Sequence, residues 1–494
     1  MKNLLYIISL CGLLTACDLQ EEPYGFYSDD NFYKSETDAE SGLLYAYNAL
    51  TFLEYSRGIF YIGDIPTETM SPKSDEAGDV YQLENWIANR ETEQLQYYFK
   101  YCYIAINRAN TVIDHIQNCS VLSETARRRI LGEAYFLRAW NYFNLVRTFG
   151  IVPVQTKMVA KLSQTTPPMA TGLDQLYDLI LGDLTRADNL LEVNKVFGRA
   201  DKVAAQSLMA KAYLTIASSK EHNVHRYTEM RREPQIMYDS AAYWAGKVVR
   251  DYKNVYDFDT NLRDIYDVDK PTGPEHIFIM PIDRSGTQEG NYSKLPLLFL
   301  PSNNSVPFYI RYGNGDLQRA NGNGWGVFLC NDEFVETQFS TTDKRRTELI
   351  HRDIYDASGN PIVPNQVKGY VSSKYVDPDF IGERTSARPY LIRFSDIALV
   401  YAEAAGPEAG LAYVNRIRER AGVTPLPSGM TTDKFREAVI KERALELAFE
   451  GNRLYDLRRT ASVTTTDIKA AGLSEAEAAY YPIPQREIDL NPNL

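Results

Sequence analysis

The chain has 494 residues, 44% of them apolar, and a formal net charge of −12. A chain of this length can bury a large core, and the length alone allows two or three domains. The negative charge argues against a protein that holds nucleic acid or anionic lipid by charge alone, because both of those partners are themselves negative.

The first sixteen residues form a short leader. Lys2 supplies a positive start, and an apolar run of about eleven residues follows, which matches a signal-peptide core and is too short to span a bilayer. Small residues then lead to Cys17. This order resembles a bacterial lipoprotein signal, so we expect Cys17 to be lipidated. An ordinary secretory leader with a coincidental cysteine is the alternative.

Residues 17–30 are interpreted as the lipidated cysteine and a tether. The stretch from Asp18 to Pro23 is acidic and ends in proline, as flexible connections often do. Its acidity resembles the signal that sends some lipoproteins to the outer face of the outer membrane. No later apolar run approaches eighteen residues, so we expect the lipid alone to hold the protein to the membrane.

Helical periodicity dominates residues 31–251. In the segment that begins at Asp201, the residues Ala205, Leu208, Ala212 and Ile216 recur on one helical face. We expect helices over residues 37–55, 91–116, 124–149, 173–191, 201–218 and 239–249.

The pattern changes between residues 252 and 390. Glycine, asparagine and proline become frequent, and short apolar runs such as Ile277–Met280 predict a few strands in a loop-rich segment. Helical periodicity returns over residues 394–405, is stopped by Gly406 and Pro407, and resumes over 408–420 and 432–449. Helix pairs of this size suggest about four degenerate tetratricopeptide-like (TPR-like) pairs, although the strict 34-residue consensus is absent.

Four stretches, together with the C-terminal end, resemble one known family in the same order along the chain. They are Glu133–Phe143 with Arg147–Pro153, Gly198–Asp201 with Ala212–Leu214, Leu391–Ile397 with Tyr401–Ala404 and Val414–Gly422, Glu442–Arg459, and finally Tyr481–Pro484 with Asn491 and Pro492. The sequence resembles the SusD/RagB family of outer-membrane nutrient-binding lipoproteins from Cys17 to its last residue.

This resemblance implies a fold and a role. The fold is a mainly α SusD-like fold, with helical parts at residues 31–251 and 391–494 packed into one globule and a ligand-facing insertion at 252–390. The role is capture of a nutrient, most often a glycan, at the cell surface, and delivery to a SusC-like TonB-dependent transporter. The family consists of binding proteins, not enzymes.

Charged residues inside the apolar helices allow two interpretations. Glu442, Glu446 and Glu450 follow one another at a spacing of four, so they share a helix face that arginines could clamp. A carboxylate pair for glycoside hydrolysis is the alternative, but 65 acidic residues make such proximity uninformative. We therefore expect these charges to be paired and buried, together with Glu133, Arg138, Arg443, Arg453, Asp456 and Arg458.

Candidate ligand-binding residues are those that pair an aromatic ring with a polar group, because a sugar presents one apolar face and a rim of hydroxyls. If residues 85–89 are helical, Trp86 and Asn89 share one face, and glycan-binding members of the family use a tryptophan and an asparagine at similar spacing. The Gly- and Asn-rich region adds Tyr309, Tyr312 and Trp325. Glycines flank Trp325 on both sides and favour exposure of its ring.

Three functional hypotheses remain open at this point. The first is a surface glycan-binding lipoprotein, the second a peptide-binding protein like the RagB branch, and the third a lipid-anchored glycosidase. The five histidines and the cysteines show no metal-ligand spacing such as C-x-x-C or H-E-x-x-H, so we expect no metal and no cofactor.

Overall fold

The computed structural model describes residues 32–73, 78–117, 119–288, 290–363 and 369–494. The expected leader, Cys17 and the tether up to residue 30 therefore lie outside the described residues. Within the described ranges, none of the helices combines the length and the apolar character that crossing a membrane requires.

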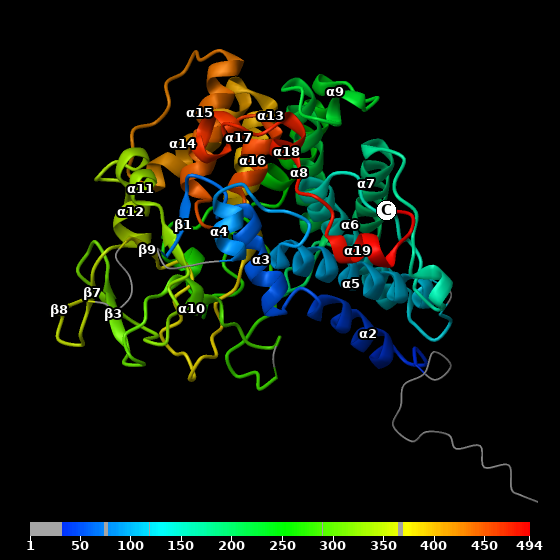
Figure 1. Ribbon diagram of the computed structural model, residues 1–494, viewed down its shortest axis with the longest axis horizontal. Helices are drawn as coiled ribbons and strands as arrows, with labels where there is room; N and C mark the ends of the chain where they lie inside the picture. Colours follow the sequence, from blue (N-terminus) through cyan, green and yellow to red (C-terminus); the bar gives the residue numbers. More distant parts are fainter. Residues whose placement is uncertain (1–31, 74–77, 118, 289, 364–368) are drawn as a thin grey trace, which may run out of the picture.

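The N-terminal part consists of helices that pack on one another in chain order, α5 on α6, α6 on α7, α7 on α8 and α8 on α9 (Figure 1). The elements are α2 (Glu36–Asn48), α3 (Leu53–Gly63), β1 (Met70–Pro72), α4 (Asp79–Glu84), α5 (Glu93–Ile116), α6 (Glu124–Phe149), η1 (Leu162–Gln164), α7 (Leu173–Leu190), α8 (Lys202–Glu221), η2 (Tyr227–Glu229) and α9 (Pro234–Asp251).

Local signals explain where these helices begin. The side chains of Ser123 and Asp201 accept hydrogen bonds from backbone N–H groups three residues later and so cap α6 and α8. The helix expected over residues 37–55 is two helices, because the chain leaves the helical conformation at Phe52, which is extended. Helix α9 starts earlier than expected, at Pro234, where the missing N–H has no intrahelical partner to lose.

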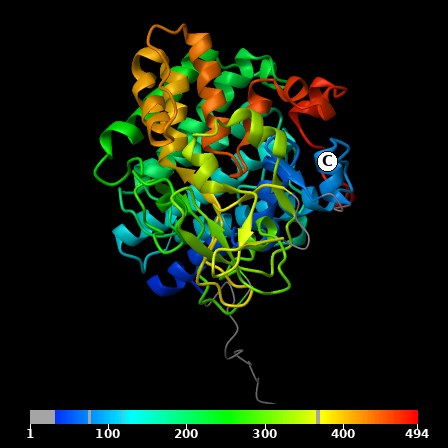
Figure 2. The ribbon, with the colours of Figure 1, turned by 90° about the vertical axis from the view of Figure 1, so that its left-hand side faces the viewer.

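The loop-rich segment is inserted between α9 and α13 (Phe394–Ala405), two helices that pack against each other. Figure 2 shows its green-to-yellow loops gathered in the lower half of the view. Its elements are η3 (Asp264–Tyr266), β2 (His276–Ile279), α10 (Leu295–Phe299), β3 (Phe308–Arg311), β4 (Leu317–Ala320), β5 (Phe328–Cys330), α11 (Asp332–Gln338), α12 (Lys344–Leu349), β6 (Ile350–His351), β7 (Ile354–Tyr355), β8 (Pro361–Ile362), β9 (Val371–Ser372) and β10 (Tyr390–Arg393).

The strands form small antiparallel sheets. Three sheets have two strands each, β1–β5, β10–β2 and β6–β9, and the fourth has the order β4-β3-β7-β8. One extended apolar core joins the helices to most of the insertion, while a separate small cluster lies beneath the four-stranded sheet. The predicted combination of helix pairs with a loop-rich part containing short strands is confirmed.

The C-terminal part returns to helices. Its elements are α13, α14 (Pro407–Arg420), α15 (Thr432–Glu446), α16 (Arg453–Arg459), α17 (Val463–Thr466), η4 (Ile468–Ala470), α18 (Glu475–Ala479) and α19 (Gln485–Leu490). Gly406, with φ of 81°, separates α13 from α14, as its sequence with Pro407 predicted. Helix α15 ends at Glu446, three residues before the expected end at Phe449, which has φ of 64°.

Buried charges connect these parts of the fold. The guanidinium of Arg393, at the end of β10, forms ion pairs with Glu275 at 2.9 Å, Glu446 at 2.7 Å and Glu450 at 2.8 Å. Arg420 on α14 contacts Glu446 at 2.6 Å as well. Arg393 and its three carboxylate partners are buried, and 7% of the Arg420 side chain is exposed. The prediction that arginines clamp these carboxylates is confirmed, and the arginines come from β10 and α14 and, for Arg345, from α12. The expectation that Glu450 shares their helix face is wrong, because α15 ends at Glu446.

Candidate ligand-binding site

The β1–β5 sheet joins the segment that precedes α4 to the strand that follows Trp325. Ser71 lies opposite Leu329 and Pro72 opposite Phe328. Beyond the strand, the Lys73 N–H donates to the Val327 carbonyl at 3.2 Å. Lys73, directly after β1, therefore lies beside the glycine-flanked segment that carries Trp325.

Trp325 keeps part of its ring accessible. Its side chain is half-buried and packs against the main core. Its backbone N–H donates to the Leu297 carbonyl at 2.6 Å, which fixes the segment against α10. The neighbouring Gly324 has no room for a side chain, since a Cβ there would lie 1.9 Å from the Leu300 carbonyl oxygen. The ring is thus held on a rigid loop, partly open to solvent.

Trp86 does not fit the expected platform. Helix α4 ends at Glu84, so Trp86 and Asn89 do not share a helical face. Only 8% of Trp86 is exposed, its ring stacks on Tyr481 at 6.2 Å between centroids, and its Nε1–H donates to Asp467 at 3.3 Å. The expectation of an open ring at this position is wrong, because the C-terminal segment covers it.

Asn89 is exposed, but its side chain has a local task. Its Oδ1 accepts the Glu91 N–H at 2.9 Å in the turn that precedes α5. Turns of this kind are a common role of asparagine side chains. The amide therefore stabilises a turn. The helical geometry that would have placed it beside the Trp86 ring is absent.

Tyr312 is also buried, with 7% of its surface exposed. Its hydroxyl donates to the Gln318 Oε1, its ring meets His351 edge-on at 5.6 Å, and burial raises its pKa to about 12. Because the ring is buried and its hydroxyl is bonded inside the fold, the geometry does not favour the expected role of Tyr312 as a polar contact for ligand. Tyr309, three residues earlier, points the other way and is half-buried.

Sequence reasoning missed the neighbours of Tyr309. In the four-stranded sheet, Tyr309 lies opposite Tyr355 on β7 and opposite Arg319 on β4. The available signal was the alternation in β3, where Phe308 and Ile310 are buried and Tyr309 is accessible. The pairing with the Tyr355 ring could not be predicted, because Tyr355 lies 46 residues later in the chain.

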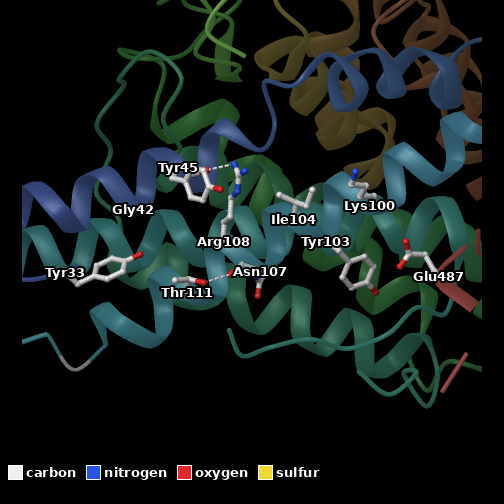
Figure 3. A pocket seen from close by; sticks show the side chains of 10 residues that line it. All are labelled: Tyr33, Gly42, Tyr45, Lys100, Tyr103, Ile104, Asn107, Arg108, Thr111 and Glu487. Carbon is white, nitrogen blue, oxygen red and sulfur yellow. Dashed lines mark hydrogen bonds between the residues drawn. The ribbon is translucent and has the colours of Figure 1, made fainter. Parts of the chain in front are cut away.

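A further hollow lies on the helical side of the molecule. This groove has a volume of about 580 Å³ between α2, α5 and α19. Figure 3 shows Tyr33 and Tyr45 toward one end, with Tyr103 and Glu487 toward the other. The guanidinium of Arg108 lies 3.6 Å from the centroid of the Tyr45 ring. Sequence reasoning missed this groove because its lining comes from three separate segments.

Two family models match the chain. The model described as the SusD family matches residues 353–494, and the model described as "Starch-binding associating with outer membrane" matches residues 33–214. Together they span well over half of the chain and include both helical parts. They also contain most of the motif stretches in which the sequence showed its resemblance.

Full-length relatives agree with the models. SusD-like protein P38 of Formosa agariphila is 26% identical over 99% of this chain and 97% of its own length. A solved laminarin-binding SusD-like protein has a TM-score of 0.75 at 23% identity, with 93% of this chain and 98% of that chain covered. The surface glycan-binding protein A of Bacteroides thetaiotaomicron, solved with laminarihexaose, has a TM-score of 0.72 at 20% identity, covering 92% and 97%. The chain therefore belongs to the SusD/RagB family.

Proposed function

We propose that this protein is a cell-surface lipoprotein that binds a glycan and delivers it to a SusC-like TonB-dependent transporter of the outer membrane. The observation that carries the proposal is that the loop-rich insertion presents partly exposed aromatic rings, Tyr309, Trp325, Tyr355 and Phe380, within one subdomain. Such rings can stack on the apolar face of a pyranose while neighbouring polar groups take its hydroxyls. Family membership and the laminarin-binding neighbour support the same role.

The buried carboxylates support binding rather than hydrolysis. A glycosidase needs one carboxylic acid that is protonated and another that faces the substrate. Glu442 and Glu446 are 0% and 1% exposed, and both are held by Arg345. Three arginines also lower the pKa of Glu446 to about 2, so it cannot serve as a proton donor near neutral pH.

Trp325→Ala is expected to weaken retention on an affinity gel that contains laminarin, by roughly 1 to 3 kcal/mol of binding free energy, because one stacking ring is removed. Its melting temperature should change little, since the ring is only half-buried. Trp86→Ala should instead lower the free energy of unfolding by about 3 to 5 kcal/mol, as truncation of a buried tryptophan does.

Tyr45→Ala is the matched control for this experiment. Tyr45 is 58% exposed but lies in the helical groove, away from the insertion. It should retain binding and stability. Loss of binding in Tyr45→Ala with full binding in Trp325→Ala would place the ligand in the groove and contradict the proposal. Retention of a peptide library with no retention of any oligosaccharide would favour the RagB-like alternative.

Cys17→Ala is expected to release the protein from the membrane fraction, because Cys17 is the only covalent anchor in the proposal. From detergent-solubilised membranes, the wild-type protein should also co-purify with a large β-barrel protein. Both measurements use cell fractionation followed by electrophoresis. A variant that stays in the membrane fraction after a high-salt wash would contradict the anchor. Recovery of the wild-type chain alone would contradict the transporter partnership.

A further inference from the structure

The outer face of the four-stranded sheet combines aromatic rings with cationic groups. Side chains alternate between the two faces, and those on the inner face form the small apolar cluster. The inner residues are Leu300, Phe308, Ile310, Ala320, Ile354 and Val376. The opposite face carries Tyr309 and Arg311 from β3, Arg319 from β4 and Tyr355 from β7. We call these four residues the arginine–tyrosine face.

The strand register places these side chains next to one another. Tyr309 lies between Arg319 and Tyr355 across the sheet. The guanidinium of Arg311 lies 4.0 Å from the centroid of the Tyr355 ring, and that of Arg319 lies 4.1 Å from the Phe380 ring. Neighbouring strands are about 4.8 Å apart, so three strands give a surface about 10 Å across, the scale of a disaccharide. Rings and guanidinium groups thus alternate on one surface.

Neither arginine is neutralised by a carboxylate among the residues that the structure describes. Arg311 donates to the Gly359 carbonyl at 2.6 Å, and Arg319 donates to the Pro378 carbonyl at 2.8 Å. Each uses only part of its donors in this way, since a guanidinium has five N–H groups. In a chain with a formal charge of −12, two such cations on one small face are unbalanced positive charge.

The nearby carboxylates are already occupied. Asp316 contacts Arg263 at 3.4 Å, and Asp379 contacts Arg284 at 3.6 Å. Asp356 accepts the N–H groups of Ser358 at 2.8 Å and of Asn360 at 2.9 Å in the turn between β7 and β8. None of these three acids forms an ion pair with Arg311 or Arg319 in the described part of the chain.

We propose that the arginine–tyrosine face binds an acidic glycan, one that carries carboxylate or sulfate groups. This inference rests on the proposed function and names its substrate class. The tyrosine rings take the apolar faces of the sugars. A guanidinium offers a planar fork that fits a carboxylate or a sulfate with two hydrogen bonds. Stacking on Tyr355 and Phe380 fixes both guanidinium groups in advance, which lowers the entropy lost on binding.

The test compares three probes on affinity gels with the full chain in detergent: polygalacturonate, dextran sulfate and uncharged dextran. The protein should be retained by a charged probe, less so as salt concentration rises, and not by dextran. Retention by polygalacturonate alone assigns carboxylates, and retention by dextran sulfate alone assigns sulfates. The double variant Arg311→Gln/Arg319→Gln should weaken that retention by about tenfold or more, because two charge-assisted contacts are lost.

The control removes the same charge elsewhere. Arg186 and Arg231 are exposed on the helical side, so Arg186→Gln/Arg231→Gln should bind the charged probe as wild type does. The variant Arg311→Lys/Arg319→Lys keeps the charge but loses the fork, and should bind less tightly than wild type. Equal losses in the two glutamine variants would overturn the inference, as non-specific attraction would explain them. Retention on laminarin without retention on either charged probe would overturn it too, while leaving the proposed function intact.

Discussion

Replacing Arg393 with leucine is expected to lower the free energy of unfolding by about 3 to 5 kcal/mol or more. Arg393 is 1% exposed and is shared by three buried carboxylates, Glu275, Glu446 and Glu450. Its Nη2 also donates to the Glu446 carbonyl at 2.6 Å. The variant would leave these buried carboxylates with too little positive charge beside them. Urea unfolding followed by circular dichroism measures the loss.

The matched control is Arg352→Leu. Arg352 also forms two ion pairs, with Asp332 at 3.7 Å and Glu336 at 3.3 Å, but its side chain is 54% exposed. Such exposed pairs contribute little to stability because water screens them. Similar losses in the two variants would show that burial does not govern the contribution of Arg393. Arg393→Lys should fall between wild type and the leucine variant, since an ammonium keeps the charge but lacks the planar five-donor fork that reaches all three carboxylates.

Asp64→Asn is expected to make the protein relatively more stable as the pH rises. Asp64 is fully buried, and desolvation raises its pKa to about 7 although it accepts the Gly451 N–H at 2.7 Å. Its Oδ1 has no hydrogen-bond partner among the residues that the structure describes. In the unfolded chain the carboxyl titrates near pH 4, so between pH 4 and pH 7 the folded state binds the extra proton. The contribution of Asp64 is therefore largest below pH 4 and is lost as the pH rises through 7.

The measurement is the difference in unfolding free energy between the variant and the wild type at several pH values. That difference should shift in favour of Asp64→Asn by about 2 to 3 kcal/mol between pH 5 and pH 8. An asparagine keeps the acceptor for the Gly451 N–H and has no proton to lose. A difference that does not change over this pH range would show that Asp64 titrates at its ordinary value in the fold.

The helices were predictable because their signals are local. The Ser123 cap and the Gly150 that follows Phe149 set both ends of α6 where the sequence placed them. Gly406 and Pro407 likewise marked the boundary between α13 and α14. Caps and periodicity act within a few residues of chain, so the sequence carries them directly. The motif stretches that indicated the family needed only the order of residues.

The sequence also predicted that the buried charges are compensated, but it did not predict which residues compensate them. A carboxylate inside an apolar helix must be compensated wherever it lies, so Glu446 was expected to meet an arginine. That Arg393 and Arg420 supply the compensation depends on how β10 and α14 pack against α15. The sequence cannot state this arrangement, because many arginines could satisfy the same requirement.

The exposure of the candidate rings was decided only by the tertiary structure. The sequence predicted that Trp86 is an exposed stacking ring, but Asp467 and Tyr481, nearly four hundred residues later in the chain, contact and cover it. Tyr309 gained its neighbour Tyr355 only through the pairing of β3 with β7. Whether a ring faces water depends on contacts between distant segments, and the spacing of residues along the chain does not encode them. The sequence by itself determined most of the helices and the family, because those signals are local or depend only on residue order, while packing decided which aromatic and charged side chains face water.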